Sequence, residues 1–149
     1  MKPPVAVRPA EILLVEDSPT DALLAREALG LSRLENELHV VQDGVEAMAF
    51  LRHEREYADA PRPDLILLDL NLPRKDGRAV LRELKTDERL KLIPVVILTT
   101  SAADADVQQA YGLHANCYIV KLVDFERFTR VIQTLEDFWF AVVRLPREV

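Results

Sequence analysis

The chain has 149 residues, enough for one domain with a sizeable hydrophobic core. Its net charge of -6 and the lack of a basic stretch exclude a nucleic-acid-binding surface. No apolar run approaches the roughly 20 residues that a membrane-spanning helix needs, and residues 1–8 lack the apolar segment of a signal peptide. The single cysteine, Cys117, excludes an internal disulfide and is typical of the reducing cytoplasm.

Short apolar runs alternate with helical segments along the chain. After a Pro-rich lead over residues 1–10, the pattern predicts strands over residues 11–15, 37–41, 65–68, 94–99 and 116–120. It predicts helices over residues 19–29, 45–57, from 77 onward, from about 104 to 112, and from 125 to about 143. Five strand-then-helix repeats indicate an α/β fold with a doubly wound, five-stranded parallel sheet.

Polar residues at the ends of these segments mark where the helices begin and end. Ser18 and Pro19 are the expected N-cap and first helical residue of the first helix, with Asp21 at the spacing of a capping box. Asp76 precedes the third helix, and the segment Ser101–Asp104 is expected to cap the fourth helix, which Gly112 can end.

The run Asp64–Leu72, between Pro63 and Pro73, has the apolar character of a strand buried on both faces. Asp69 stands where this strand ends. In open α/β sheets ligand chemistry gathers at the carboxyl ends of the strands, and three other predicted strands also end in polar residues. We therefore expect five residues to lie close together at one edge of the sheet: Glu16, Asp17, Asp69, Thr99 and Lys121.

Three carboxylates in one place repel one another, so the cluster should bind a cation or carry raised pKa values. A partly open site with only oxygen ligands suits Mg²⁺. Asp69 is placed to be a nucleophile that forms an acyl phosphate, and Lys121 can pair with Asp69 and then with the phosphoryl group. The Thr99 hydroxyl can donate a hydrogen bond to a phosphoryl oxygen.

These motifs resemble a response-regulator receiver domain of two-component signalling. They are Leu13–Asp17, Leu67–Pro73, Ile97–Ser101, Tyr118 and Lys121, and the resemblance covers nearly the whole chain. It implies a flavodoxin-like (βα)5 receiver domain over residues 11–143 that is a signalling protein and not an enzyme. A histidine kinase would supply the phosphoryl group to Asp69, with Mg²⁺ bound by Glu16, Asp17, Asp69 and the backbone carbonyl of Asn71.

The resemblance also implies a switch. Thr99 would move toward phosphorylated Asp69, and the ring of Tyr118 would turn inward into the vacated space. The face formed by the fourth helix, fifth strand and fifth helix would thereby control partner binding or dimerisation. We expect no output domain, because the chain ends soon after the last helix.

One residue departs from the family pattern. Proline usually follows the lysine of the last strand, often with a cis bond, whereas Leu122 follows Lys121 here. A cis bond before a residue other than proline costs about 3–4 kcal/mol, so we expect a trans Lys121–Leu122 bond and a reshaped following loop.

The last predicted helix has an apolar stripe too wide for one contact. Its members are Phe125, Phe128, Val131, Ile132, Leu135, Phe138, Trp139, Val142 and Val143. A thicker core is one interpretation; we favour a homodimer surface, since large apolar patches mark interaction sites. The tail over residues 144–149 and the loop at residues 53–63 resemble regulators paired with bacterial phytochrome kinases, which would imply a dimer on the fourth-helix–fifth-helix face.

Three other functions fit the sequence less well. An aspartyl phosphatase of the haloacid-dehalogenase type usually needs Asp-x-Asp, and Asp69-Leu70-Asn71 lacks the second acid. A flavodoxin-like cofactor binder needs a phosphate loop after the first strand, where Glu16 and Asp17 would repel phosphate. A degenerate receiver that only binds partners is favoured by Leu122 alone.

Overall fold

A computed structural model of the chain describes residues 9–31, 35–121 and 125–136. Its centre is one sheet of five strands in the order β2-β1-β3-β4-β5, and every neighbouring pair is parallel. The strands are β1 (Ala10–Val15), β2 (Asn36–Val41), β3 (Leu65–Leu68), β4 (Val95–Thr99) and β5 (Cys117–Val120). The predicted doubly wound parallel sheet is therefore confirmed, with strand ends within a residue of those expected.

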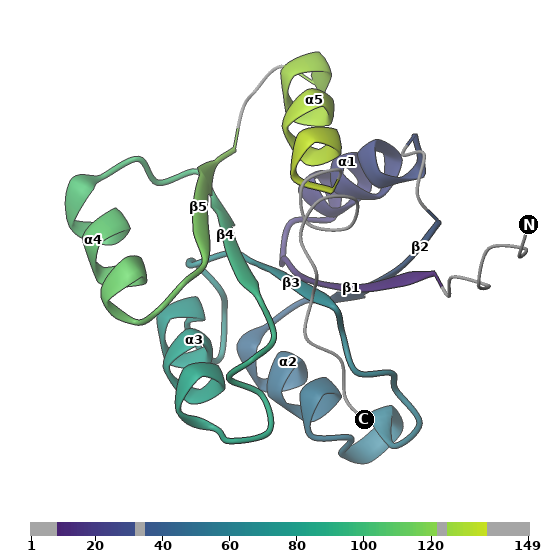
Figure 1. Cartoon of the computed structure of the whole chain (residues 1–149), viewed down its shortest axis with the longest axis vertical. Helices are drawn as coiled ribbons and strands as arrows, with labels where there is room; N and C mark the ends of the chain where they lie inside the picture. Colours follow the sequence, from purple (N-terminus) through teal and green to yellow (C-terminus); the bar gives the residue numbers. More distant parts are fainter. Residues whose placement is uncertain (1–8, 32–34, 122–124, 137–149) are drawn as a thin grey trace, which may run out of the picture.

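Helices cover both faces of the sheet. They are α1 (Pro19–Gly30), α2 (Gly44–Leu51), α3 (Gly77–Thr86), α4 (Asp104–Gly112) and α5 (Phe125–Glu136), with a short 3₁₀ helix, η1 (Arg55–Tyr57). Helices α1 and α5 lie together on one face, and α2, α3 and α4 lie on the other (Figure 1). None of the described helices has the length and apolar character needed to cross a membrane.

The central strands are apolar throughout because each face of the sheet is buried. Successive side chains of a strand point to opposite faces. Ile12 and Leu14 therefore pack with the α1 residues Ala25, Ala28 and Leu29. The alternate residues of the same strands pack under α2 and α3; among them are Leu13, Val15, Ile66, Leu68, Val95 and Ile97.

Two of the expected helix caps, Ser18 and Asp76, are present, and Asp43 caps α2, which was not predicted. Ser18 Oγ accepts the N–H of Asp21 at 3.2 Å, Asp43 Oδ1 accepts that of Glu46 at 2.8 Å, and Asp76 Oδ2 accepts that of Arg78 at 3.1 Å. The prediction for α4 was wrong in detail. Its N-cap is Ala103, whose methyl side chain cannot accept a hydrogen bond. The Ser101 hydroxyl accepts the N–H of Ala103 at 3.4 Å and donates to Asp106 Oδ2 at 2.5 Å.

The predicted helix over residues 45–57 is interrupted. Helix α2 ends at Leu51, and the chain then passes through left-handed backbone at His53 (φ 57°) and Arg55 (φ 55°) before η1. The break comes where burial ends, because Leu51 is buried and residues 52–56 are exposed. The predicted extension of the last helix to Val143, the lead over residues 1–8, the tail over residues 144–149 and the Lys121–Leu122 bond lie outside the described residues.

Candidate functional site

The candidate site lies at the carboxyl ends of the central strands. Glu16 and Asp17 follow β1, Asp69 follows β3, Thr99 is the last residue of β4, and Lys121 follows β5. Strands β1 and β3 are neighbours although β2 lies between them in sequence, so the strand order reverses here. Open α/β sheets bind their ligands outside the strands at such a reversal.

Three carboxylates gather at this edge as the sequence predicts. Glu16, Asp17 and Asp69 each offer one oxygen, and these oxygens all lie within 4.8 Å of one another. Glu16 and Asp69 are buried, whereas Asp17 is exposed to solvent. A set of oxygen donors that is open on one side fits a divalent cation that keeps part of its water shell.

The Lys121 ammonium is the cation of this cluster. Its Nζ donates to Glu16 Oε1, to Asp69 Oδ2 at 3.1 Å and to Asp21 Oδ2 at 3.0 Å. The three acceptors match the three protons of an ammonium group. Asp21 was predicted only as part of a helix cap, and its contact with Lys121 spans 100 residues of sequence.

Burial and charge shift the pKa values of this cluster. Burial raises the pKa of the Glu16 carboxyl to about 7, against the opposing effect of the hydrogen bond from Lys121. Burial alone would lower the pKa of the Lys121 ammonium, but the hydrogen bonds to Glu16 and Asp21 outweigh burial and raise it. The Lys121 ammonium therefore stays charged among four carboxyl groups, those of Glu16, Asp17, Asp21 and Asp69. The net charge of the site is negative, which favours binding of a second cation.

The backbone around Asp69 is held on both sides. Its N–H donates to Val15 O at 3.1 Å, and its Oδ1 accepts the N–H of Asn71 at 3.2 Å. Gly77, at the start of α3, packs so closely that a Cβ there would lie 2.1 Å from the Asp69 carbonyl oxygen. This role of Gly77 was not predicted, because Asp76-Gly77 signalled only the start of a helix.

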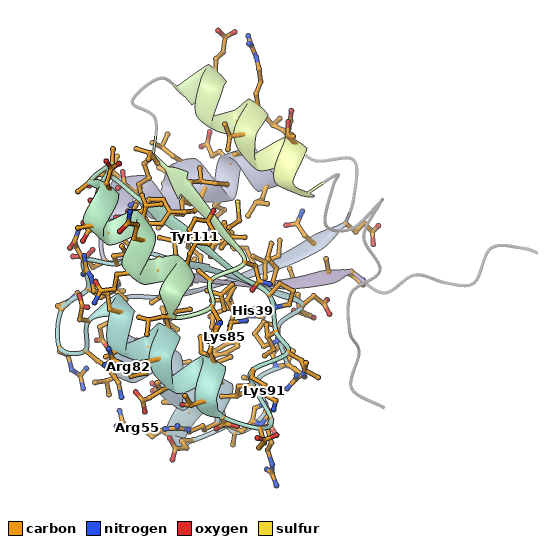
Figure 2. The ribbon with its side chains drawn as sticks, turned by 60° about the vertical axis from the view of Figure 1, so that its left-hand side comes forward. His39, Arg55, Arg82, Lys85, Lys91 and Tyr111 are labelled. Atoms are coloured by element: carbon orange, nitrogen blue, oxygen red, sulfur yellow. The ribbon has the colours of Figure 1, made fainter. Side chains whose placement is uncertain are left out.

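Thr99 and Tyr118 differ in how their hydroxyl groups are satisfied. Thr99 is fully buried, and its Oγ1 has no hydrogen-bond partner among the described residues. The Tyr118 hydroxyl donates to the backbone carbonyl of Ser101 at 2.8 Å. Its backbone N–H donates at 3.2 Å to the hydroxyl of Tyr111, which lies on α4 beside β5 (Figure 2).

The loop after β4 is tied to α3 through Asp106. The Ser101 hydroxyl and Arg78 Nη2 donate to its two oxygens at 2.5 and 2.8 Å, and these bonds lower the pKa of the Asp106 carboxyl. Since Tyr118 donates to Ser101, the network links β5 to the start of α3. Burial raises the pKa of the Tyr118 hydroxyl.

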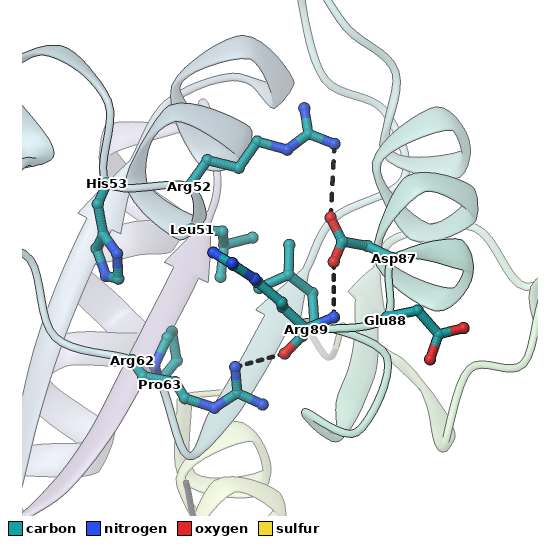
Figure 3. Close-up of a pocket in the computed structure, with 9 residues that line it drawn as sticks. Leu51, Arg52, His53, Arg62, Pro63, Asp87, Glu88 and Arg89 are labelled. Atoms are coloured by element: carbon teal, nitrogen blue, oxygen red, sulfur yellow. Dashed lines mark hydrogen bonds and ion pairs between the residues drawn. The ribbon is translucent and has the colours of Figure 1, made fainter.

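A pocket of about 670 Å³ lies away from this site, formed by segments that follow α2 and α3 and precede β3 (Figure 3). Two of its charged side chains contact backbone groups of Arg89. Arg62 Nη1 donates to the Arg89 carbonyl at 2.6 Å, and Asp87 accepts the Arg89 N–H at 2.8 Å. None of the predicted site residues lines the pocket, so we assign these contacts to loop packing.

Comparisons with known proteins agree with this geometry. The family model described as the response regulator receiver domain matches residues 12–133. The chain is 51% identical over 138 residues to the response regulator Rcp1 of Synechocystis sp., covering 93% of this chain and 94% of that protein. The solved structure of the phosphorylated cyanobacterial phytochrome response regulator RcpA matches with a TM-score of 0.90 and 50% identity, covering 94% of this chain and 100% of that one. The Mn²⁺-bound form of Rcp1 matches with a TM-score of 0.88 and 50% identity, covering 93% and 100%.

Proposed function

The chain belongs to the response regulator receiver domain family, and from this premise we propose that it accepts a phosphoryl group on Asp69 from the phosphohistidine of a sensor histidine kinase. The observation that carries the proposal is the position of Asp69, which is buried beside two further carboxylates and 3.1 Å from an ammonium group. Nucleophile, cation and metal ligands then belong to one site.

The transfer is a displacement at phosphorus. A carboxylate oxygen of Asp69 forms a P–O bond, the P–N bond of the phosphohistidine breaks, and the imidazole leaves with the electron pair. The Lys121 ammonium pairs with Asp69 before the transfer and with the new phosphoryl group after it. It can do so because it already lies within hydrogen-bond distance of Asp69 Oδ2. The Thr99 hydroxyl, which has no partner among the described residues, donates to a phosphoryl oxygen.

The metal of the proposed reaction is Mg²⁺, which Glu16, Asp17, Asp69 and the backbone carbonyl of Asn71 would hold. The donor set supports this, since it consists of oxygens, with three carboxylates close enough to share one ion. When bound, the ion neutralises phosphoryl oxygens during transfer. The relative Rcp1 has a solved Mn²⁺-bound form.

The output is a change of the face built from α4, β5 and α5, controlled by Thr99 and Tyr118. Tyr118 is supported as a switch residue by its hydrogen bond to Ser101, since that bond connects β5 to the loop before α4. The altered face regulates partner binding or a homodimer formed through the last helix. The receiver domain extends over residues 11–143, with a short lead before it and a tail after it.

The partner is a cytoplasmic sensor kinase of the phytochrome class. The support comes from relatives, because RcpA is described as a cyanobacterial phytochrome response regulator and shares 50% identity with this chain. Tests of this assignment need the kinase itself, whereas phosphoryl acceptance can be tested with the chain alone.

The experiment is intact mass spectrometry after incubation with acetyl phosphate and Mg²⁺. We expect one phosphoryl adduct on the wild-type chain, and none after chelation of the metal or in Asp69→Asn. Asp64→Asn is the matched control, since Asp64 is a buried carboxylate at the other end of β3. An adduct of equal yield in Asp69→Asn would overturn the assignment of the phosphoacceptor.

A further inference from the structure

Lys121 contacts one carboxylate that is not part of the three-carboxylate cluster. Asp21 Oδ2 lies 3.0 Å from Nζ, while the cluster consists of Glu16, Asp17 and Asp69. The Asp21 side chain is 35% exposed, compared with 9% for Lys121. Asp21 is therefore the most exposed of the three carboxylates that contact the ammonium.

The start of α1 holds Asp21 in this place. The Ser18 hydroxyl accepts the N–H of Asp21 at 3.2 Å, and the Ser18 N–H donates to Glu16 Oε2 at 3.2 Å. Pro19 begins the helix, and its ring restricts the backbone there. One short segment thus positions two of the three carboxylates that contact Lys121.

The other two partners of Lys121 have a second task. Glu16 and Asp69 belong to the carboxylate cluster, so the ammonium and a divalent ion compete for the same oxygens. Two cations among shared carboxylates repel each other. Asp21 is the partner that Lys121 does not share with the cluster, and it can retain the ammonium when the other two engage an ion.

We propose that Asp21 is a positioning residue that retains the Lys121 ammonium beside Asp69 while the carboxylate cluster holds a divalent ion, until the ammonium pairs with the phosphoryl group. The inference rests on the proposed function. In this proposal Asp21 acts through Lys121. Its effect therefore differs from that of a carboxylate that contributes only negative charge to the site.

The test is a double-mutant cycle on Mg²⁺ affinity, measured by isothermal titration calorimetry with wild type, Asp21→Asn, Lys121→Gln and the double variant. Asp21→Asn should weaken Mg²⁺ binding about tenfold in the wild-type background, because Lys121 is then left to compete for Glu16 and Asp69. In the Lys121→Gln background the same substitution should cost less than about twofold. Glu27→Gln removes a charge from the exposed side of the same helix and should change affinity in neither background.

Equal losses in both backgrounds would overturn the inference, since Asp21 would then act by charge alone. Asp21→Glu keeps the charge but lengthens the side chain, and it should recover part of the affinity. The rate of adduct formation from acetyl phosphate should fall in Asp21→Asn and recover in Asp21→Glu. A wild-type chain that binds Mg²⁺ but forms no adduct would defeat the proposed function and not the calorimetric cycle, so the two failures are distinguishable.

Discussion

Two partly buried lysines lie at opposite ends of the sheet and have opposite electrostatic environments. Lys121 lies at the carboxyl ends of the strands and donates to carboxylates of Glu16, Asp21 and Asp69. Lys85, at the other end, donates to uncharged oxygens: Lys91 O at 3.2 Å, Ile93 O at 3.0 Å and Asn116 Oδ1 at 3.1 Å (Figure 2). Burial lowers the pKa of the Lys85 ammonium, while hydrogen bonds to carboxylates raise that of Lys121 despite burial.

The difference shows what each lysine does. The protons of the Lys85 ammonium are donated to uncharged oxygens of the segment after α3 and of Asn116, just before β5. Lys85 therefore connects these two segments by hydrogen bonds. The carboxylates around Lys121 can also bind a second cation, and the ammonium can pair with an incoming anion, which fits the charge changes of the proposed phosphoryl transfer. Lys85 thus has a structural role at one end of the sheet, and the proposed role of Lys121 in phosphoryl transfer lies at the other end.

The largest expected effect on stability comes from Lys121→Met. Without the ammonium, Glu16 and Asp69 stay buried with no positive partner, and we expect the free energy of unfolding in chelator to fall by about 3 kcal/mol. Urea denaturation measures this loss. Lys91→Met is the control, because the Lys91 ammonium is exposed and contacts the exposed carboxylate of Glu88. A loss no larger than that of the control would mean that the Lys121 bonds add no net stability.

The pH dependence of stability gives the next largest effect. The pKa of Glu16 is about 7 in the folded state, compared with an ordinary value of 4.5 that applies to the unfolded chain. Between these pH values the folded state therefore binds more protons than the unfolded state. Stability without metal should therefore fall by about 2 kcal/mol as the pH rises from 4.5 to 7. Glu16→Gln should remove this slope in urea denaturation at several pH values, whereas Glu27→Gln should retain it. An unchanged slope in Glu16→Gln would assign the protons to another group.

Lys85→Met tests the other end of the sheet. Methionine fills similar space but donates no hydrogen bond, and the carbonyls of Lys91 and Ile93 lose their ammonium donor. We expect a cost of about 1–2 kcal/mol in urea denaturation. Phosphoryl adduct formation should be unchanged, since Lys85 lies at the opposite end of the strands from Asp69. If Lys85→Met folds normally but forms no phosphoryl adduct, Lys85 has more than a structural role.

The sequence predicted the strand pattern and most of the site for one physical reason. Parallel strands share an edge, so residues at their carboxyl ends, such as Glu16, Asp69 and Lys121, meet whatever the loops do. Glu16, Asp17, Asp69 and Lys121 could therefore be placed together before any side-chain geometry was known. Their roles in metal binding and phosphoryl transfer remain predictions.

The features that the sequence did not predict depend on side-chain reach or local backbone. Asp21 meets Lys121 because a helix start and a strand end happen to lie side by side, and no local pattern encodes this contact. The end of α2 depends on left-handed backbone at His53; histidine is enriched in this conformation, but it adopts it too seldom for the sequence to predict the break. Ser101 matched a cap by type, yet its hydroxyl contacts Asp106 instead of backbone N–H groups of the first helical turn.

The smallest expected effect comes from making the two lysines alike. Asn116→Asp replaces a neutral oxygen beside Lys85 with a carboxylate that can still accept from the Val95 N–H, now 2.8 Å from Asn116 Oδ1. The pKa of Lys85 should rise, because an opposite charge favours the ammonium. The free energy of unfolding should change by about 0.5 kcal/mol or less, since Asn116 is exposed and its new charge is screened. NMR titration of the Lys85 side chain measures the pKa, and Asn36→Asp serves as a distant control. An unchanged Lys85 pKa would show that burial and not the charge of its partners separates the two lysines.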